Sequence, residues 1–422
     1  MKETIVDMAD SKRLARTRHT FGVFRDPETD WVFSRTLQYM NVGAAQVGEC
    51  LSAARKIDEG APDSWMNEWS RVAEMVEAHG DESLDRGHAT SAKYSYLRAS
   101  NYYRTAEYGA PPTHPSFRRL WERGVDCFRK AARCFKDPVT IVEVPIDGYR
   151  LPGYFWRSHE GEKRPTLVLI GGNDGTIEEN FLACGFAAHE RGYNFFTFDH
   201  PGHRGAVHLY PDCVKRPDPE EPYGQALDFL ATLPGFDDRL MVAGLSFGGY
   251  AAARVVSSDE RVTAAVLNSP IIDVHEMSFS GFKGLVTKIP KPVLSRLIER
   301  KWRRSPLTYA LKEYSAWSAG LKISTDIAMM SDYFRDWRIS REMLERITCP
   351  VLAMVSNGDG PILMKQAETF LESVSSREKK LHHFTLKKDG SDDHVQLDNL
   401  SRGNQVMFDW IDEIMSRIQV TE

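Results

Sequence analysis

The sequence predicts an α/β fold: a doubly wound, mostly parallel sheet with a helical N-terminal domain and a helical cap insertion. Three observations predict it. Strand and helix patterns alternate over most of residues 136–422, the pattern over residues 30–135 is helical, and the alternation lapses between Pro270 and Cys349. We therefore expect an N-terminal domain over 1–135 and a second domain over 136–422, with the insertion at about 271–348.

The N-terminal region repeats apolar residues at helical spacing. One face runs from Phe33 to Ala54, and a second runs from Trp65 to Val76 after a Pro-Asp-Ser start. Because glycine is a poor helix former, we expect the second helix to end before Gly80. Two further helices are predicted over residues 91–108 and 117–132, so this domain should be entirely helical.

The pattern changes to strands after residues 136–138. Two runs rich in β-branched and aromatic residues, 139–144 and 149–156, flank the turn residues Asp147 and Gly148, which indicates a hairpin. Further strands are expected over 166–170, 194–199, 239–243, 262–268, 351–356 and 382–386. Helices are expected at about 177–190, 224–233, from 247, at 363–374 and up to about 417. Alternation of this kind places helices on both faces of a parallel sheet, and the hairpin adds antiparallel edge strands.

Composition narrows the class of protein. Hydrophobic residues make up 42% and charged residues 27%, as in ordinary globular proteins, and the net charge of −5 provides no basic surface for nucleic acid. The six cysteines form neither a CxxC pair nor a zinc pattern, so we expect no disulfide framework, no metal and a reducing, cytoplasmic location. The first residues build no apolar leader, and no run is long enough to span a membrane. A small-molecule substrate is the expected partner.

A G-x-S-x-G sequence carries the strongest chemical signal. It runs from Gly244 to Gly248, directly after a predicted strand and before a predicted helix. The two glycines allow a tight, strained turn that exposes the hydroxyl of Ser246 beside the helix N-terminus. Ser246 is therefore the candidate nucleophile.

A serine hydroxyl needs a base, and the base needs an orienting acid. A turn of this kind between a strand and a helix is called a nucleophile elbow. In proteins that have one, the order along the chain is nucleophile, acid, histidine, and the histidine follows the last strand. His394 meets that requirement, whereas His382 and His383 lie in the strand itself. Asp359 follows the strand over 351–356 and is the candidate acid. Asp392 and Asp393 are weaker candidates, because neighbours on a loop rarely face each other.

Negative charge on a substrate carbonyl must be met by fixed donors. The N–H of Phe247, the residue after the nucleophile, is one candidate. The glycine-rich loop over 171–175 supplies the second, for which Asn173 N–H is the best candidate, to within one residue. His200, His203 and Arg204 follow another strand, where they either contact substrate or stabilise a turn.

These motifs resemble those of α/β-hydrolases in the branch that contains 2,6-dihydroxypseudooxynicotine hydrolase and the fungal polyketide-shortening hydrolases of pigment pathways. The resemblance spans most of the chain. Its motifs are Gly48-Glu49, Tyr102-Tyr-Arg104, the Gly-Gly-Asn-Asp loop at 171–174, Asp199-His-Pro-Gly202, the elbow, and Asp-Gly-Ser-Asp-Asp-His ending at His394. It implies a cofactor-free enzyme of secondary metabolism, often a homodimer, whose N-terminal helices close over the active site. One departure is His200 and His203, which replace the Gly and Gln of the more usual Asp-Gly-Pro-Gly-Gln sequence.

The expected function is that of a serine hydrolase acting on a small aromatic or polyketide-like metabolite. The resemblance implies cleavage of an ester or of a carbon–carbon bond next to a ketone. An acyltransferase or cyclase with the same three residues is the alternative, and a non-catalytic ligand-binding protein would normally lack one of them. The many aromatic residues of the N-terminal region and the insertion either line a substrate pocket or form an interdomain core.

Overall fold

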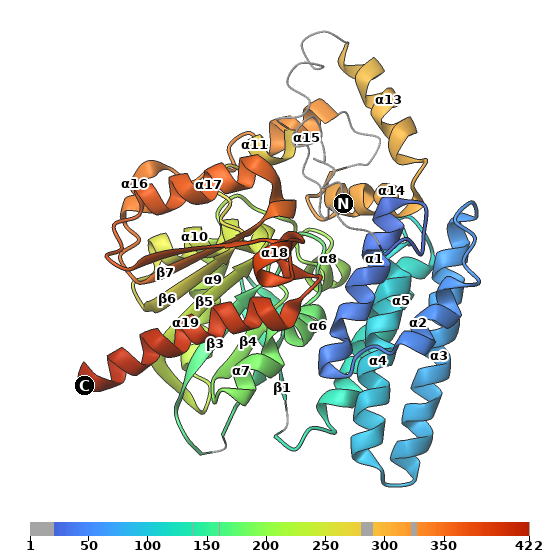
Figure 1. Cartoon of the computed structure of the whole chain (residues 1–422), viewed down its shortest axis with the longest axis horizontal. Helices are drawn as coiled ribbons and strands as arrows, with labels where there is room; N and C mark the ends of the chain where they lie inside the picture. Colours follow the sequence, from blue (N-terminus) through green and yellow to red (C-terminus); the bar gives the residue numbers. More distant parts are fainter. Residues whose placement is uncertain (1–20, 138, 160, 280–289, 322–326, 422) are drawn as a thin grey trace.

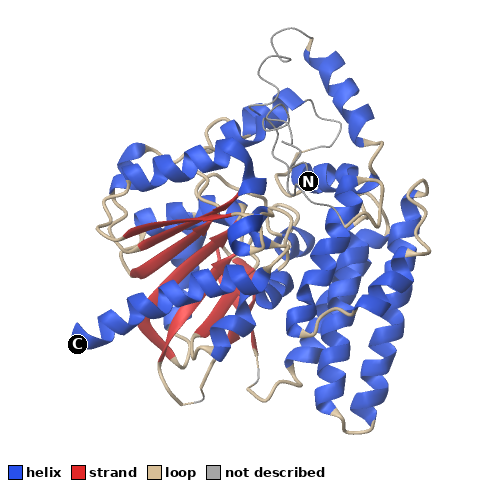
Figure 2. Ribbon diagram, in the orientation of Figure 1, coloured by secondary structure: helices blue, strands red, loops and turns tan. Residues whose placement is uncertain are grey.

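The computed structural model describes residues 21–137, 139–159, 161–279, 290–321 and 327–421. A group of long helices stands beside a sheet that carries helices on both faces (Figures 1 and 2). The first 20 residues, where no leader is predicted, lie outside the described residues, as do Pro138 near the predicted domain boundary and two parts of the predicted insertion. None of the described helices is both long and apolar enough to cross a lipid bilayer.

The N-terminal region is helical, as predicted, but two of its boundaries differ from the prediction. The elements are α1 (Pro27–Gln38), the 3₁₀ helix η1 (Tyr39–Val42), α2 (Val47–Ala54), α3 (Pro62–Asp85), α4 (Ala89–Tyr108) and α5 (Ser116–Ala132). The apolar face over 33–54 is broken at Gly43, whose φ of +75° ends the first segment. Helix α3 continues through Gly80, where a Cβ atom would lie 2.7 Å from the ring of Tyr96. This glycine therefore permits close packing of α3 on α4 instead of ending the helix.

The sheet has eight strands in the order β1-β2-β4-β3-β5-β6-β7-β8. Its strands are β1 (Thr140–Ile146), β2 (Tyr149–Trp156), β3 (Arg164–Ile170), β4 (Asn194–Phe198), β5 (Phe236–Leu245), β6 (Val262–Asn268), β7 (Val351–Ser356) and β8 (Lys379–Phe384). β1 pairs antiparallel with β2 and β2 with β4, while the pairs from β4 to β8 are parallel. The predicted doubly wound α/β class is confirmed.

Alternate residues of the central strands belong to different hydrophobic cores. Leu167 and Leu169 of β3 face a core shared with the N-terminal helices, whereas Val168 and Ile170 face the opposite one. The first face also packs on α6 (Ile177–Asn180), the π-helical turn η2 (Phe181–Gly185), α7 (Phe186–Glu190) and α19 (Leu400–Thr421). The other face packs on α9 (Glu220–Ala231), α10 (Phe247–Ser258) and α17 (Gly360–Ser373).

The segment between β6 and β7 is helical where it is described. It forms α11 (Val274–Phe279), α13 (Lys291–Trp302), α14 (Pro306–Trp317), α15 (Ile327–Tyr333) and α16 (Arg341–Glu345). Helices α11, α13, α14 and α15 lie above the sheet in Figure 1, with α14 next to α1. The remaining short helices are α8 (Arg204–Leu209), η4 (Asn357–Asp359), α18 (Leu386–Asp389) and η5 (His394–Gln396).

Candidate active site

The strand order reverses between β3 and β5, which are parallel neighbours. From β3 the chain continues to β4 on one side, whereas β5 leads to β6 on the other. In open parallel sheets, the crevice beyond the carboxyl ends of two such strands is the usual ligand site. The loop after β3 carries Asn173, and the turn after β5 carries Ser246, so the sheet topology brings these two predicted residues to one crevice.

Ser246 occupies a strained turn between β5 and α10. Its φ of 56° and ψ of −121° lie outside the regions that L-residues favour. The neighbouring glycines have no room for a side chain. A Cβ at Gly248 would lie 2.2 Å from the carbonyl oxygen of Ile170, and one at Gly249 would lie 1.9 Å from that of Ser269. The glycines therefore let this turn pack against β3 and the end of β6, and they hold Ser246 at the sheet edge.

His394 lies between Ser246 and Asp359. Its Nε2 atom is 2.7 Å from Ser246 Oγ, and its Nδ1 atom is hydrogen-bonded to Asp359 Oδ1. The Asp359 side chain is fully buried. Its Oδ2 atom accepts hydrogen bonds from the Ser356 N–H at 2.7 Å and from the Ser269 hydroxyl at 2.9 Å. The structure thus brings together the three residues that the sequence predicts for catalysis, and it fixes the carboxylate through two further donors.

The competing candidates have other partners. His382 Nε2 lies 3.1 Å from Asp389 Oδ1, and His383 Nε2 lies 2.8 Å from Asn357 Oδ1. Asp393 accepts a hydrogen bond from the backbone N–H of His394 at 2.8 Å, and its carboxylate also accepts one from the indole N–H of Trp31 at 3.0 Å. Burial raises the pKa of Asp393 well above its ordinary value. None of these side chains is hydrogen-bonded to the His394 ring.

The loop after His394 is held by a polar cluster that the sequence did not predict. Val395 and Gln396 have φ values of 51° and 54°. The Gln396 amide accepts a hydrogen bond from Asn268 Nδ2 at 2.7 Å and donates one to the Ser356 hydroxyl at 2.9 Å. Gln396 thereby joins the histidine loop to the ends of β6 and β7. The signal for it was weak, since a glutamine two positions after a histidine is unremarkable in a sequence.

The loop after β3 faces the serine. A Cβ at Gly172 would lie 3.2 Å from the Cβ of Ser246, a tight contact that the glycine avoids. The Asn173 side chain is fixed, because its Oδ1 accepts a hydrogen bond from Lys215 Nζ at 2.5 Å and its Nδ2 donates to Ser315 Oγ at 3.1 Å. Phe247 is the first residue of α10, where backbone N–H groups have no partner within the helix. Both predicted oxyanion donors are thus next to Ser246 or border the same cavity.

A buried ionic network attaches the N-terminal helices to this loop. Arg35 of α1 pairs with Asp174 at 2.9 Å and with Glu179 at 2.9 Å. Arg104 of α4 pairs with Glu179 at 2.8 Å, and its guanidinium donates to the backbone carbonyl of Asp174 at 2.5 Å. Arg204 donates to the same carbonyl at 3.1 Å. Three guanidinium groups therefore converge on the segment that carries Asn173.

The residues after β4 are structural. His203 is buried, and its Nδ1 lies 2.5 Å from Asp199 Oδ1. Burial raises the pKa of Asp199 and lowers that of His203, which favours the neutral form of each group. His200 and Arg204 are also buried, and none of the four lines the cavity next to Ser246. For His200, His203 and Arg204, the structure therefore favours stabilisation of a turn over contact with the substrate.

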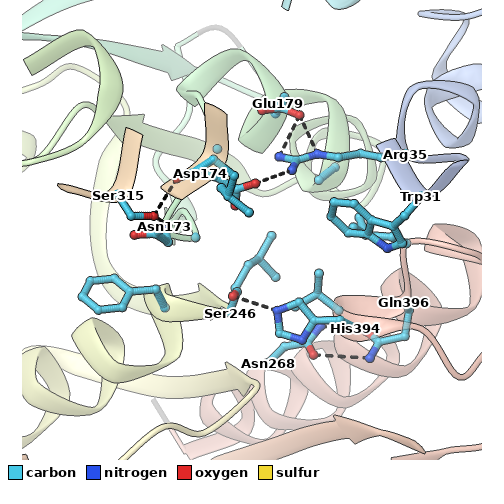
Figure 3. A pocket seen from close by; sticks show the side chains of 18 of the residues that line it. Trp31, Arg35, Asn173, Asp174, Glu179, Ser246, Asn268, Ser315, His394 and Gln396 are labelled. Atoms are coloured by element: carbon cyan, nitrogen blue, oxygen red, sulfur yellow. Dashed lines mark hydrogen bonds and ion pairs between the residues drawn. The ribbon is translucent and has the colours of Figure 1, made fainter. Parts of the chain in front are cut away.

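A cavity of about 590 Å³ opens beside Ser246 and His394. It is lined from three sides: by Trp31 and Arg35 of α1, by the loops after the strands, and by the insertion (Figure 3). Among the described residues, its aromatic lining is formed by Trp31, Tyr39, Phe247, Phe279, Trp302 and Phe334, and its flexible apolar lining includes Met277, Met330, Met354 and Met407. Other aromatics, such as Trp69 and Tyr102, pack with each other in the helical core. Of the two roles predicted for the aromatic residues, some side chains line the cavity and others pack in a core.

The chain is similar to proteins of a known family. A model described as alpha/beta hydrolase family matches residues 167–378. Alpha/beta hydrolase gkaG of Penicillium citrinum is 27% identical, with 83% of this chain and 86% of the relative covered. Hydrolase ORFZ of Pyricularia oryzae is 30% identical over 78% of this chain and 81% of its own. The 20-hydroxy-prefusarin hydrolase FUS2 of Gibberella moniliformis is 32% identical over 61% of this chain and 64% of its own.

Among solved structures, the 2,6-dihydroxy-pseudo-oxynicotine hydrolase has a similar fold. It superposes with a TM-score of 0.69 at 20% identity, covering 90% of this chain and 95% of its own. AbyA5 superposes with a TM-score of 0.62 at 17% identity, covering 90% and 94%. These findings confirm the resemblance drawn from the motifs, including its branch. The chain belongs to the alpha/beta hydrolase family.

Proposed function

We propose that this chain is a serine hydrolase that cleaves an acyl-type bond in a small, largely apolar metabolite. Ser246 is the nucleophile, His394 the general base and Asp359 the orienting acid. The observation that carries the proposal is the contact of 2.7 Å between His394 Nε2 and Ser246 Oγ beside a cavity of about 590 Å³. That volume falls within the range of roughly 300 to 1,000 Å³ that is typical of small-molecule sites.

The reaction starts with transfer of the Ser246 hydroxyl proton to His394 Nε2 as Oγ attacks the substrate carbonyl. Asp359 holds the Nδ1–H of His394 and stabilises the imidazolium. The tetrahedral oxyanion accepts hydrogen bonds from the backbone N–H groups of Phe247 and Asn173. Collapse breaks the bond to the leaving group, which takes the proton from His394, and water then hydrolyses the acyl-enzyme by the same route.

Two bond types fit this sequence of steps. In an ester the leaving group is an alkoxide, and in a β-diketone it is an enolate that His394 protonates at carbon. The aromatic and methionine lining supports an aromatic or polyketide-like substrate. The names of FUS2 and of the structural neighbour, which refer to prefusarin and pseudo-oxynicotine compounds, support the same substrate class.

The N-terminal helices are part of the proposed enzyme. We propose that residues 1–135 form a domain that covers the active site of a second domain, 136–422, whose insertion at about 271–348 completes the cavity. The contribution of Trp31 and Arg35 to the lining supports this arrangement. A homodimer and a cytoplasmic location belong to the same proposal, and sedimentation of the purified protein and cell fractionation would test them.

Labelling with a fluorophosphonate, followed by intact-mass measurement, tests the nucleophile. We expect one adduct on the wild type and none on Ser246→Ala. Ser278→Ala is the matched control, because Ser278 also lines the cavity and should not affect labelling. A panel of esters, thioesters and β-diketones then identifies the bond. An adduct on Ser246→Ala, or none on the wild type, would contradict the proposal.

A further inference from the structure

Lys215 is a buried lysine next to the loop that carries Asn173. It lies between α8 and α9 and is 4% exposed. Its Nζ atom donates hydrogen bonds to Asn173 Oδ1 at 2.5 Å and to Ser318 Oγ at 2.8 Å. Its backbone is fixed as well, since its N–H donates to the Ser318 carbonyl at 2.9 Å and its carbonyl accepts from the Tyr333 hydroxyl at 2.5 Å. The position of this ammonium group is therefore strongly determined.

This cation has no carboxylate within 4 Å in the described part of the chain. Asp174 attracts this charge without forming a direct ion pair with it. Burying a charge without a direct ion pair is costly, so proteins keep such groups where they serve a purpose. The Nζ atom lies 5.6 Å from the ring centroid of Phe247 and 5.6 Å from that of Tyr314. Lys215 thus contacts Asn173 and approaches Phe247, the two residues whose N–H groups are the proposed oxyanion donors.

A series of hydrogen bonds starts at Lys215, and each side chain in it donates to the next residue. Lys215 donates to Asn173, Asn173 Nδ2 donates to Ser315 Oγ at 3.1 Å, and the Ser315 hydroxyl donates to the Leu311 carbonyl at 2.9 Å. Figure 3 shows Asn173 and Ser315 together on one wall of the cavity, across from Trp31. Because the Asn173 amide accepts a hydrogen bond at its oxygen and donates one from its nitrogen, these hydrogen bonds hold the Asn173 side chain in a single orientation.

We propose that Lys215 is a positioning residue that fixes Asn173, and with it the oxyanion loop, and that places a positive charge beside the oxyanion. This proposal rests on the proposed function, because it assigns Lys215 a role in the same reaction. An ammonium group in a water-poor site stabilises nearby negative charge far more than it would in water. The benefit arises as the oxyanion forms, so it should act on the rate of attack more than on substrate binding.

The charge of Lys215 should depend on pH near neutrality. Burial lowers its pKa to about 7, against the opposing effect of Asp174, and Arg204 lowers it further. One other buried group close by titrates in the same range, because burial raises the pKa of Asp199, the partner of His203, to about 7. Lys215→Met retains Asp199, so the part of the pH dependence that this variant loses belongs to Lys215. Burial lowers the pKa of His200 and of His203, which stay neutral, and burial raises the pKa of Tyr314 and Tyr333. Oxyanion stabilisation should therefore fall as pH rises through the pKa of Lys215.

The rate of fluorophosphonate labelling tests this role without the natural substrate, because the phosphonyl oxygen occupies the oxyanion site. We expect Lys215→Met to label more slowly than the wild type below neutral pH, on the order of 10- to 100-fold. The wild-type rate should decline above neutral pH, and Lys215→Met should lack this decline. Lys215→Arg keeps a charge at every pH, so it should also lack the decline and should retain more of the rate than Lys215→Met.

Two further variants separate positioning from a structural role. Ser318→Ala removes the other side-chain partner of Nζ, and it should retain both the rate and the decline. Asn173→Ala keeps the backbone N–H but removes the link, so adding Lys215→Met to it should lower the rate by less than Lys215→Met does alone. If Lys215→Met does not fold, Lys215→Arg and Asn173→Ala provide the same test.

An equal loss in Lys215→Met and Ser318→Ala, with the alkaline decline kept in Lys215→Met, would overturn the proposal. The same holds if Lys215→Met and Lys215→Arg label as fast as the wild type at every pH. Absence of labelling on wild-type Ser246 is a different result, since it would contradict the proposed function itself.

Discussion

The ionic network that joins the N-terminal helices to the loop after β3 should be important for stability, and Arg104→Met tests it. Arg104 is 8% exposed in its side chain, and its guanidinium bonds to Glu179, to Glu107 and to the Asp174 carbonyl at 2.8, 2.9 and 2.5 Å. Glu107 is fully buried. Loss of one partner from a buried ionic pair typically costs about 3 to 5 kcal/mol, because the other charge stays buried.

Compensation within the network sets the expected value at the low end of that range. Arg35 still pairs with Glu179, and Arg204 still pairs with Glu107. We therefore expect Arg104→Met to lower the free energy of unfolding by about 3 kcal/mol. The Asp174 carbonyl also loses a donor, so the Asn173 loop should become less ordered and fluorophosphonate labelling should slow.

Urea unfolding followed by circular dichroism measures the effect, with Arg86→Met as the control. Arg86 pairs with Glu82 at 2.7 Å on the surface of α3, and the two side chains are 69% and 60% exposed. Such pairs contribute at most about 1 kcal/mol, so the control should unfold almost as the wild type does. Equal unfolding free energies for Arg104→Met and Arg86→Met would refute the argument that burial makes this network strong.

Three further outcomes are expected. Gly249→Ala should abolish labelling and greatly destabilise the fold, because its Cβ would lie 1.9 Å from the Ser269 carbonyl oxygen. A stable variant that is labelled normally would contradict the geometry of the elbow. Trp31→Phe should slow labelling with little change in melting temperature, because it removes the indole N–H that donates to Asp393, the neighbour of His394. An unchanged labelling rate would show that this contact is dispensable. The folded-state pKa of Lys215 lies below its ordinary 10.5, so its burial penalty is complete below pH about 7 and fades as pH rises toward 10.5. The unfolding free energy of the wild type should therefore increase relative to Lys215→Met over that window, and a constant difference in urea unfolding would show that the pKa of Lys215 is not lowered in the folded protein.

The sequence anticipated the parts of the site that follow from local chain geometry. The elbow around Ser246 requires small residues within a few positions, and such spacing is visible in the sequence. The order of Ser246, Asp359 and His394 follows from which loops end the strands, and the alternation of strands and helices was clear enough to place those loops. The predicted helix boundaries were less accurate at glycines, because a glycine can either end a helix or allow two helices to pack closely. Gly43 ends a helix through its positive φ, whereas Gly80 permits helix packing, and both look the same in a sequence.

The tertiary structure alone decided what surrounds those residues. Trp31 reaches Asp393 across 362 positions of chain, a separation at which sequence spacing carries no information. Lys215 is equally undetectable, since a lysine between two helices is normally solvated, and it is buried here because α14 and α15 fold over it. Chain-local rules fix the turn that exposes a nucleophile. Which helix closes the cavity and which cation lies beside the oxyanion loop depend on contacts between distant segments, and these form only when the whole chain packs.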